Sequence, residues 1–223
     1  MTQDTAVIIP AHNEQRHIKT VIRKVRQQKV KGCRIIVVDD GSTDRTYEIA
    51  KEEGLTVLRH AINLGKGAAL KTGADYSVKT GAKNLVFIDS DGQHMPEDIP
   101  RFLKALHGTD IVFGSRTLSR KMPSILKFGN SFINKVNSLL FGIKLRDTQS
   151  GYRAMTSTAY RKIRWRSCGY SVESEMVANT GKKRLKYREI TIKTIYSDRY
   201  KGTTVIDGIK IVLSMLWWKL SRR

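Results

Sequence analysis

The sequence predicts an α/β protein with a mostly parallel sheet and helices on both faces. In the first 115 residues, short apolar runs alternate with segments whose apolar residues recur at helical spacing. The runs are continuous rather than alternating, as strands buried on both faces require. With 223 residues, 40% of them hydrophobic and 27% charged, the chain is long enough for one such domain.

Each predicted element follows from its own residues. The predicted strands are apolar runs that end in polar or glycine-containing turns, at residues 6–9, 35–38, 55–58, 85–88 and 111–113. The predicted helices lie between them, at residues 18–25, around 47–50, from 66 to about 79, and from 96 onward. We expect Pro10 to end the first strand, because proline cannot donate to a strand ladder. Pro96 is expected at the first position of its helix, where a missing N–H costs nothing.

The pattern changes after residue 115. Residues 120–142 mix large apolar side chains with lysines, which predicts one or two amphipathic helices with a basic edge. Residues 205–220 predict a further apolar helix that ends in Trp217 and Trp218. Tryptophan beside Lys and Arg is typical of a membrane–water boundary. We therefore expect this part of the chain to lie on a membrane surface.

Net charge is large and unevenly distributed. The chain carries +21 at pH 7; residues 1–110 have 17 basic and 14 acidic side chains, whereas residues 111–223 have 24 and 6. Such an excess predicts an anionic partner for the second half. An anionic lipid surface or a phosphorylated ligand fits this prediction. A nucleic-acid-binding protein is the remote alternative, because it would leave the motifs at the strand ends without a role.

Cys33 and Cys168 are far apart in the sequence and form no metal-type pair, so we expect two free thiols and no disulfide or zinc framework. The chain passes from Met1 almost directly into its first apparent strand, and no signal peptide is expected. No run of about 20 uncharged apolar residues is present, so no transmembrane helix is expected either.

The segment Asp89-Ser90-Asp91-Gly92-Gln93-His94 follows the fourth predicted strand. In an open α/β sheet, ligands bind at the carboxyl ends of the strands. Two carboxylates two residues apart suit a hard divalent cation that also holds substrate phosphates. The sequence therefore predicts a metal-dependent enzyme acting on a diphosphate substrate.

Three other polar segments are expected at the same edge: Pro10–Glu14, Asp39–Ser42 and Asn63–Gly67. Asp39 or Asp40 could accept hydrogen bonds from a nucleobase or ribose. Main-chain N–H groups at a helix N-terminus can hold phosphates. The spacing of glycines in Asn63–Gly67 matches neither a dinucleotide fingerprint nor a P-loop, which excludes hydride transfer and ATP hydrolysis.

Taken in order, these motifs resemble those of family 2 glycosyltransferases of the GT-A fold. The segments that carry the resemblance are Val7–Glu14, Val37–Ser42 and Asp89–His94. Asp147–Arg153 and the segment 189–204 are similar to signatures of dolichol-phosphate mannose synthases and related polyprenyl-phosphate glycosyltransferases. The resemblance extends over essentially the whole chain. It implies a GT-A, Rossmann-like sheet with amphipathic membrane-interface helices.

The resemblance also implies roles for the matching positions. Those implied to bind the nucleotide-sugar are Pro10, His12, Glu14, Val38, Asp39, Asp40, Lys66, Asp89, Ser90, Asp91 and Gln93. Those implied to hold Mg²⁺ or Mn²⁺ are Asp89, Asp91 and Gln93. Those implied to face the acceptor phosphate are Arg116, Arg153, Arg199 and Thr204. The catalytic candidates are Asp91, Arg116, Arg199 and, as a spare carboxylate near the site, Glu175.

The single domain of residues 1–223 is expected to be divided accordingly. Residues 1–115 would bind the nucleotide-sugar. Residues 116–204 would form the acceptor half, with interface helices at about 120–142. Residues 205–223 would form a C-terminal amphipathic helix that associates with the membrane. The resemblance places such an enzyme at the cytoplasmic face of the cell membrane, as a peripheral or monotopic protein.

The implied reaction is metal-dependent, inverting transfer of one mannose, glucose or GlcNAc from a GDP- or UDP-sugar to dolichyl or polyprenyl phosphate. His12 stands where mannose synthases have Tyr, and no Lys follows Thr204 where they have one. UDP-glucose and UDP-GlcNAc are therefore as open as GDP-mannose. A lipid monophosphate is anionic at neutral pH and needs no strong general base. A soluble or polysaccharide acceptor is the alternative. A further alternative is an inactive nucleotide-sugar sensor, but the intact Asp89 and Asp91 argue against it.

Overall fold

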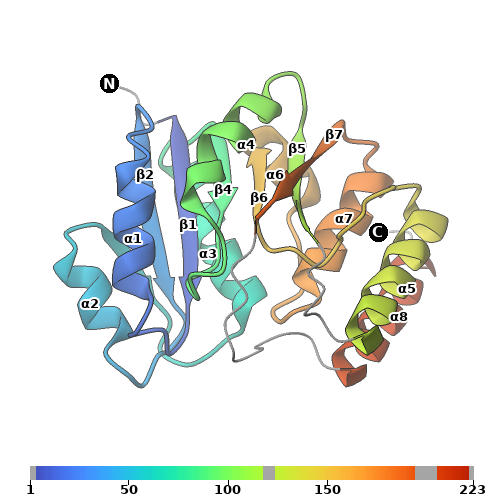
Figure 1. The fold of residues 1–223 in the computed structure, drawn as a ribbon, viewed down its shortest axis with the longest axis horizontal. Coiled ribbons are helices and arrows are strands. Elements are labelled where there is room, and N and C mark those ends of the chain that lie inside the picture. Colours follow the sequence, from blue (N-terminus) through green and yellow to red (C-terminus); the bar gives the residue numbers. More distant parts are fainter. Residues whose placement is uncertain (1–3, 118–123, 194–204, 221–223) are drawn as a thin grey trace.

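The computed structural model describes residues 4–117, 124–193 and 205–220, and it confirms the predicted α/β class (Figure 1). Within these residues, seven strands form one sheet in the order β3-β2-β1-β4-β6-β5-β7. The strands are β1 (Thr5–Ala11), β2 (Cys33–Asp39), β3 (Thr56–Arg59), β4 (Asn84–Phe87), β5 (Ile111–Arg116), β6 (Arg153–Thr156) and β7 (Tyr187–Ile192). β6 runs antiparallel to both neighbours, and the other neighbouring strands are parallel.

Helices cover both faces of this sheet (Figure 1). They are α1 (Ile18–Gln27), α2 (Thr46–Glu52), α3 (Lys66–Lys79), α4 (Ile99–Leu106), α5 (Ser124–Phe141), α6 (Ser157–Ile163), α7 (Val172–Lys182) and α8 (Val205–Leu220), and the short 3₁₀ turn η1 (Pro96–Asp98) precedes α4. Val7 and Ile9 point into the core shared with α1 and α4. Ile8, between them, points into the core shared with α3, α6 and α7. This alternation along buried strands explains why the strand sequences are continuously apolar.

Pro10 does not end the first strand as predicted, because β1 continues to Ala11. Pro10 is paired in register with Val38 of β2. On the other side of β1, the ladder with β4 stops at Ile8 and Phe87. The missing N–H of Pro10 is tolerated there because β4 has already left the ladder.

The strand directions gather the polar segments at one edge of the sheet. β1, β2, β4 and β5 point the same way, so their carboxyl ends share an edge. β6 is antiparallel and therefore starts at this edge. Residues 147–152, which lead into β6, are thus delivered beside the turns that follow β1, β2 and β4.

Helices α5 and α8 pack side by side at the end of the molecule away from β2 (Figure 1). Ile133, Phe141, Ile211 and Met215 are buried in a small core that these helices share with Ala178 of α7. The Lys219 ammonium donates to the carbonyl of Leu140, where a cation complements the helix C-terminus. The predicted helices are confirmed, with α5 forming one helix over the described part of residues 120–142. In the described parts of the chain, every helix is too short or too polar to cross a bilayer.

Candidate active site

The loop after β4 carries the predicted metal residues. Asp89 and Asp91 follow the strand directly, and Ser90 between them is buried. The main-chain N–H of Gln93 donates to Oδ1 of Asp91 at 2.9 Å, which closes a tight turn. Nδ1 of His94 accepts a long hydrogen bond from the N–H of Asp89, at 3.3 Å. The His94 ring also stacks on Tyr152, so it links this loop to the protein core.

A lysine bridges this loop to the second half of the chain. Nζ of Lys66, the first residue of α3, lies 2.7 Å from Oδ1 of Asp89 and 2.9 Å from Oε1 of Glu173 in α7. Gly151 lies directly against the pair: a Cβ there would be 2.7 Å from Nζ of Lys66 and 2.8 Å from Oδ2 of Asp89. A larger residue here would push these two side-chain ends out of their observed positions.

Charges at this site are unevenly compensated. Burial alone would lower the pKa of Lys66, but Asp89 and Glu173 raise it, so Lys66 is an ammonium. Burial likewise opposes ionisation of Asp89, yet Lys66 and then His94 hold its pKa below the usual value. Burial, and next the charge of Asp89, raises the pKa of Asp91. The two carboxylates therefore repel each other, and Lys66 compensates mainly Asp89.

These residues fit a divalent cation completed by a substrate. In the described chain, no cluster of three His, Cys, Asp or Glu side chains forms a complete metal site. Magnesium, however, is commonly bound by one or two carboxylates together with substrate phosphates and water. Asp89 and Asp91 supply such a pair, and a cation would relieve their repulsion. Gln93 lies in the same turn, and its side chain as a ligand stays a prediction.

Asp39, at the end of β2, is fully buried, and neither of its carboxylate oxygens accepts a hydrogen bond from the described residues. Nε of Arg59 lies 3.1 Å from Oδ2, close enough for an ion pair but without hydrogen-bond geometry. A buried acceptor left without a donor is costly. A ligand N–H would satisfy it, provided that Arg59, which is 43% exposed, moves aside.

The carboxylate of Asp40 accepts hydrogen bonds from the protein itself. Oδ1 accepts from Nδ1 of His60 and the N–H of Leu64, and Oδ2 accepts from the N–H of Gly65. The carboxylate is buried and all of these bonds hold the turn before α3. Asp40 therefore organises this turn together with His60, and its contact with a nucleotide stays a prediction.

The turn after β1 joins the turn after β2. Nδ1 of His12 lies 2.9 Å from the carbonyl of Asp40, and the N–H of Glu14 donates to Oγ1 of Thr46. Pro10 and Val38 are buried within their strands, and the Val38 side chain lies in the core beneath α3. The Val38 side chain therefore points away from the polar edge, and a contact of this residue with the nucleotide stays a prediction. His12 and Glu14 do lie at the predicted edge.

Arg116 ends β5 at this same edge and is anchored by a carboxylate. Its Nε and Nη2 donate to the two oxygens of Asp147 at 2.6 and 3.0 Å, a bidentate pair. Burial opposes ionisation of Asp147, but Arg116 holds its pKa below the usual value. Its charge also acts on Asp89, so Arg116 belongs electrostatically to the predicted metal site.

Arg153 does not fit its prediction as a phosphate ligand. It is 1% exposed, and its guanidinium donates to the carbonyls of Ser150, Thr148 and Glu173. These bonds tie the segment before β6 to the first turn of α7. The residue is an internal brace, because its donors point into the protein.

Glu175 does not fit a catalytic role. Its carboxylate is buried and accepts from the N–H groups of Arg166 and Ser167. Glu173, two residues earlier, is the carboxylate that reaches Lys66, and the sequence reasoning missed it. Residues two apart on a helix point to nearly opposite sides, so the sequence indicated that only one of these two glutamates could face the metal loop.

The loop held by Glu175 covers the start of α3. Its backbone comes so close that a Cβ on Gly67 would be 2.3 Å from the carbonyl oxygen of Ser167. The N–H of Ala68 donates to the carbonyl of Cys168. Both glycines around Lys66 thus serve close packing, and the expected phosphate cradle at this helix N-terminus is largely occupied by the loop. The predicted site residues Arg199 and Thr204 lie outside the described residues.

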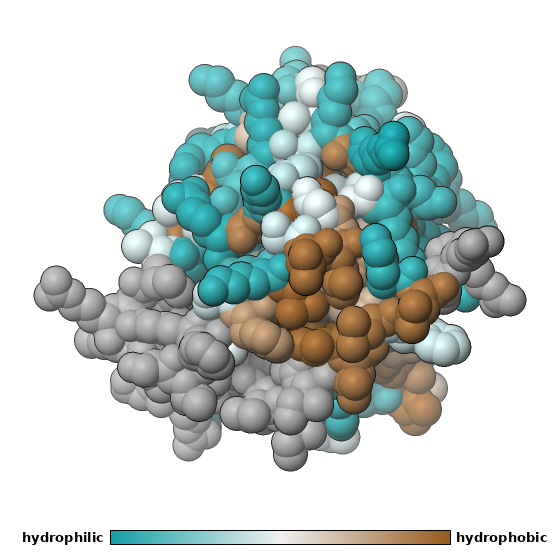
Figure 2. All heavy atoms as spheres, turned by 90° about the vertical axis from the view of Figure 1, so that its right-hand side faces the viewer, coloured by the Kyte–Doolittle hydropathy of each residue, from teal (hydrophilic) through white to brown (hydrophobic). Residues whose placement is uncertain are grey.

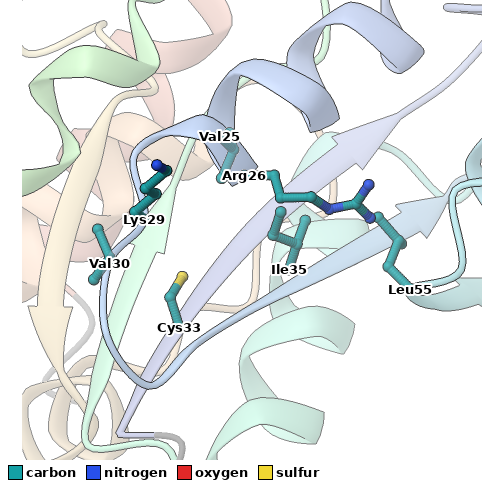
Figure 3. A pocket seen from close by; sticks show the side chains of 7 residues that line it. All are labelled: Val25, Arg26, Lys29, Val30, Cys33, Ile35 and Leu55. Carbon is teal, nitrogen blue, oxygen red and sulfur yellow. The ribbon is translucent and has the colours of Figure 1, made fainter.

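A separate small pocket lies near the start of β2, at the opposite edge of the sheet (Figure 3). The side chains that line it are Val25, Arg26, Lys29, Val30, Cys33, Ile35 and Leu55. Burial raises the pKa of the Cys33 thiol to about 11. The pocket holds no carboxylate, and it is distinct from the polar edge.

Comparisons with known proteins identify glycosyltransferases as similar to this chain. Residues 6–164 match the family model of glycosyl transferase family 2. The UDP-N-acetylglucosamine–dolichyl-phosphate N-acetylglucosaminyltransferase of Methanococcus voltae is 33% identical, over 97% of this chain and 96% of its own. The polyprenol monophosphomannose synthase of Mycolicibacterium smegmatis is 30% identical, over 94% and 83%.

Solved structures agree on the fold. Glucosyl-3-phosphoglycerate synthase from Mycobacterium tuberculosis, in complex with Mn²⁺, UDP and phosphoglyceric acid, superposes with a TM-score of 0.73 at 21% identity. The match covers 97% of this chain and 78% of that one. It confirms the predicted GT-A type of sheet.

Proposed function

Because the chain belongs to glycosyl transferase family 2, we propose that it transfers one hexose from a nucleotide-sugar to a polyprenyl or dolichyl phosphate. The observation that carries this proposal is the extent of the likeness. The family match ends at residue 164, yet two relatives named for dolichyl-phosphate or polyprenol substrates align with more than nine-tenths of the chain. The likeness therefore includes the basic second half, where the acceptor is expected.

The donor end of the reaction is assigned to the edge formed by β1, β2 and β4. Asp89 and Asp91 would hold Mg²⁺ or Mn²⁺, with Gln93 beside them. When bound, the cation would withdraw charge from the leaving nucleoside diphosphate. Asp39 would accept a hydrogen bond from the nucleobase. The sugar stays open among mannose, glucose and GlcNAc, since relatives named for different sugars are similarly identical to this chain.

The acceptor end of the reaction is assigned to the second half. A lipid monophosphate carries its negative charge at neutral pH, so its oxygen needs aiming and desolvation rather than a strong base. Arg116, held in place by Asp147, has the planar geometry suited to phosphate. We assign the same purpose to Arg199 and Thr204 from the sequence alone.

A membrane surface is the proposed location of this acceptor. Exposed apolar side chains on α5 and α8 form the outer apolar face, made of Phe132, Leu139, Leu213, Leu216, Trp217 and Leu220 (Figure 2). On α8 these positions recur at helical spacing, opposite the stripe that packs on α5. A contiguous apolar face on a strongly basic half favours the surface of an anionic bilayer. We also propose that this surface is the cytoplasmic face of the cell membrane.

These assignments support the division expected from the sequence. We propose residues 1–115 as the nucleotide-sugar half and residues 116–204 as the acceptor half. Residues 205–223, which include α8, would form the membrane-associating segment. Lys66 and Glu173 join the two halves at the proposed metal loop.

The test is transfer of radiolabelled sugar from a panel of GDP- and UDP-sugars to a short polyprenyl phosphate, in Mn²⁺ or in EDTA. We expect one donor to deliver label to the organic phase, and EDTA to abolish it. Asp91→Asn should lower the rate by about a hundredfold or more, because one of two metal carboxylates is lost. Asp4→Asn, before β1 and at the far edge, is the matched control and should retain full activity.

Two results would contradict the proposal in different ways. Label that enters phosphoglycerate or a polysaccharide but never the lipid would move this chain to the soluble-acceptor alternative. Equal transfer in EDTA and in Mn²⁺, with Asp91→Asn as active as wild type, would remove the metal from the mechanism.

A further inference from the structure

The ammonium of Lys66 contacts one of the two carboxylates that are proposed to bind the cation. It lies 2.7 Å from Oδ1 of Asp89, a charge-assisted hydrogen bond at short distance. In the described chain, Asp91 has no cation within ion-pair distance. A divalent ion shared by Asp89 and Asp91 would therefore meet Lys66 at one of its two carboxylates. The ion and the ammonium repel each other at such short range, so binding of the ion at Asp89 weakens the contact with Lys66.

Glu173 gives the displaced ammonium a second place. Its carboxylate is 6% exposed and lies 2.9 Å from Nζ of Lys66. Within the described residues, Lys66 is the cation at ion-pair distance from the Glu173 carboxylate, and the buried Arg153 also acts on it electrostatically. Loss of Lys66 would leave this buried carboxylate without its ion-pair partner, which is unfavourable. Lys66 is thus held from both sides, and it can give up one contact while it keeps the other.

The local structure allows the tip of Lys66 to move while its backbone stays fixed. The flanking Gly65 and Gly67 pack against the loop 166–169, which holds the start of α3 in place. The four-carbon stem of lysine is flexible, and this side chain is 21% exposed. Its ammonium already contacts Glu173, so it can leave Asp89 without losing this second partner.

We propose that Lys66 is a resident counter-cation of Asp89, which a divalent ion displaces, and that Glu173 retains the displaced ammonium. This inference rests on the proposed metal site at Asp89 and Asp91. It assigns Lys66 and Glu173 as positioning residues that tune metal affinity. It also gives a purpose to a salt bridge that joins the two halves of the chain.

Opposite effects of two variants on metal binding test the proposal. The probe is Mn²⁺ alone, titrated without nucleotide and followed by the electron paramagnetic resonance signal of the free ion. Lys66→Met removes the competing charge and keeps an unbranched side chain that is one atom shorter. We expect Mn²⁺ to bind about tenfold more tightly, since one charge-assisted hydrogen bond need not be broken. Glu173→Gln should weaken binding about threefold, because the ammonium is then left to Asp89 alone.

Matched controls separate this local exchange from a general change of charge. Lys71→Met removes a charge from the same helix, and Glu52→Gln removes one from an exposed position of α2. Both should change Mn²⁺ affinity by less than twofold. Thermal unfolding of each variant, followed by circular dichroism, should show that all four remain folded.

The outcomes distinguish failure of this inference from failure of the proposed function. If wild type binds Mn²⁺ but Lys66→Met binds it equally or more weakly, the counter-cation role is wrong and the metal site stands. If Glu173→Gln binds as tightly as Lys66→Met, Glu173 does not retain the ammonium. If wild type binds no Mn²⁺, with or without UDP or GDP, both the metal site and this inference fall together.

Discussion

At the scale of single residues, Gly151 is the glycine that lies against both Lys66 and Asp89. A side chain at this position would force the ends of Lys66 and Asp89 to shift. Gly151→Ala would place a methyl group 2.7 Å from Nζ and 2.8 Å from Oδ2. We expect transferase activity to fall at least tenfold, because the metal carboxylate must shift, whereas the unfolding free energy should change by less than about 1.5 kcal/mol.

Gly169→Ala is the control for this variant, because a Cβ there meets no atom within 4 Å. It should match wild type in both rate and melting temperature. Full activity in Gly151→Ala would show that Asp89 need not hold its observed position.

The two cysteines provide a residue-scale test that depends on pH. Burial raises the pKa of Cys33 to about 11, whereas Cys168 is exposed. The thiolate is the reactive form. Below pH 11, Cys33 is mostly the neutral thiol, so its alkylation rate should rise about tenfold per pH unit from pH 7 to pH 10 without levelling off.

Iodoacetamide labelling, followed by peptide mass spectrometry, measures this rate at each residue. Cys168 should be labelled first at pH 8, and unfolding the protein in urea should abolish the difference. Equal labelling of the two cysteines in the folded protein at pH 8 would contradict the burial of Cys33 beside the pocket at the start of β2.

At the scale of elements, the start of α3 packs closely against the backbone of the loop 166–169. Gly67→Ala would place a Cβ 2.3 Å from the carbonyl oxygen of Ser167, and a backbone atom cannot turn away as a side-chain tip can. The hydrogen bond from Nε1 of Trp165 to the carbonyl of Gly67 would be disturbed as well. We expect a loss of about 1–3 kcal/mol in unfolding free energy.

Urea unfolding followed by tryptophan fluorescence measures this loss. Gly129→Ala, within α5, is the matched glycine-to-alanine change, because no atom lies within 4 Å of its Cβ position. It should be neutral or stabilising by up to about 1 kcal/mol, since alanine favours the helix. If Gly67→Ala unfolds at the same urea concentration as wild type, the loop does not pack as described.

Elements that could be predicted are those whose residues alone determine them. The continuous apolar runs predicted β1, β2 and β4. The polar turn after β4 predicted that Asp89 and Asp91 lie at the carboxyl ends of these strands, where the structure places them. β6 was missed because Arg153 begins it and no apolar run marks it; its neighbours supply the ladder. α7 has buried Glu173, Ser174, Glu175 and Thr180, so it shows no clear apolar stripe.

The site shows the same division. Single positions at strand ends follow from local sequence, but the pairing of Lys66 with Asp89 and Glu173 joins three distant segments through tertiary packing. Arg153 shows the opposite error: its motif indicated a ligand contact, and the fold uses its donors as an internal brace. Identity and spacing cannot distinguish a guanidinium that faces a ligand from one that faces three carbonyls.

At the scale of the whole molecule, the outer apolar face and the basic second half should act together. The exposed side chains of α8 would enter the bilayer interface, and Lys and Arg would meet anionic headgroups. Binding to vesicles should therefore need both contributions. We expect strong binding to vesicles that contain phosphatidylserine, weak binding to pure phosphatidylcholine, and a decline in affinity as salt rises from 50 to 500 mM.

The apolar contribution is tested by Leu213→Ser combined with Trp217→Ser. These side chains are 61% and 70% exposed, so the fold should tolerate the change. Each large apolar side chain contributes about 1.5–3 kcal/mol when fully buried, and partial insertion should still make binding at least tenfold weaker. Ile62→Ser is the control: it is 67% exposed but lies after β3, at the other end of the strand order.

Co-sedimentation with vesicles measures both variants, and size-exclusion chromatography tests the competing occupant of the face. Unchanged vesicle binding in the double variant would show that the outer apolar face does not contact the membrane. A wild-type dimer that the double variant dissociates would assign the face to a second copy of the chain. Loss of vesicle binding, together with loss of transfer to lipid-embedded but not to detergent-dispersed acceptor, would show that the face delivers the active site to its substrate.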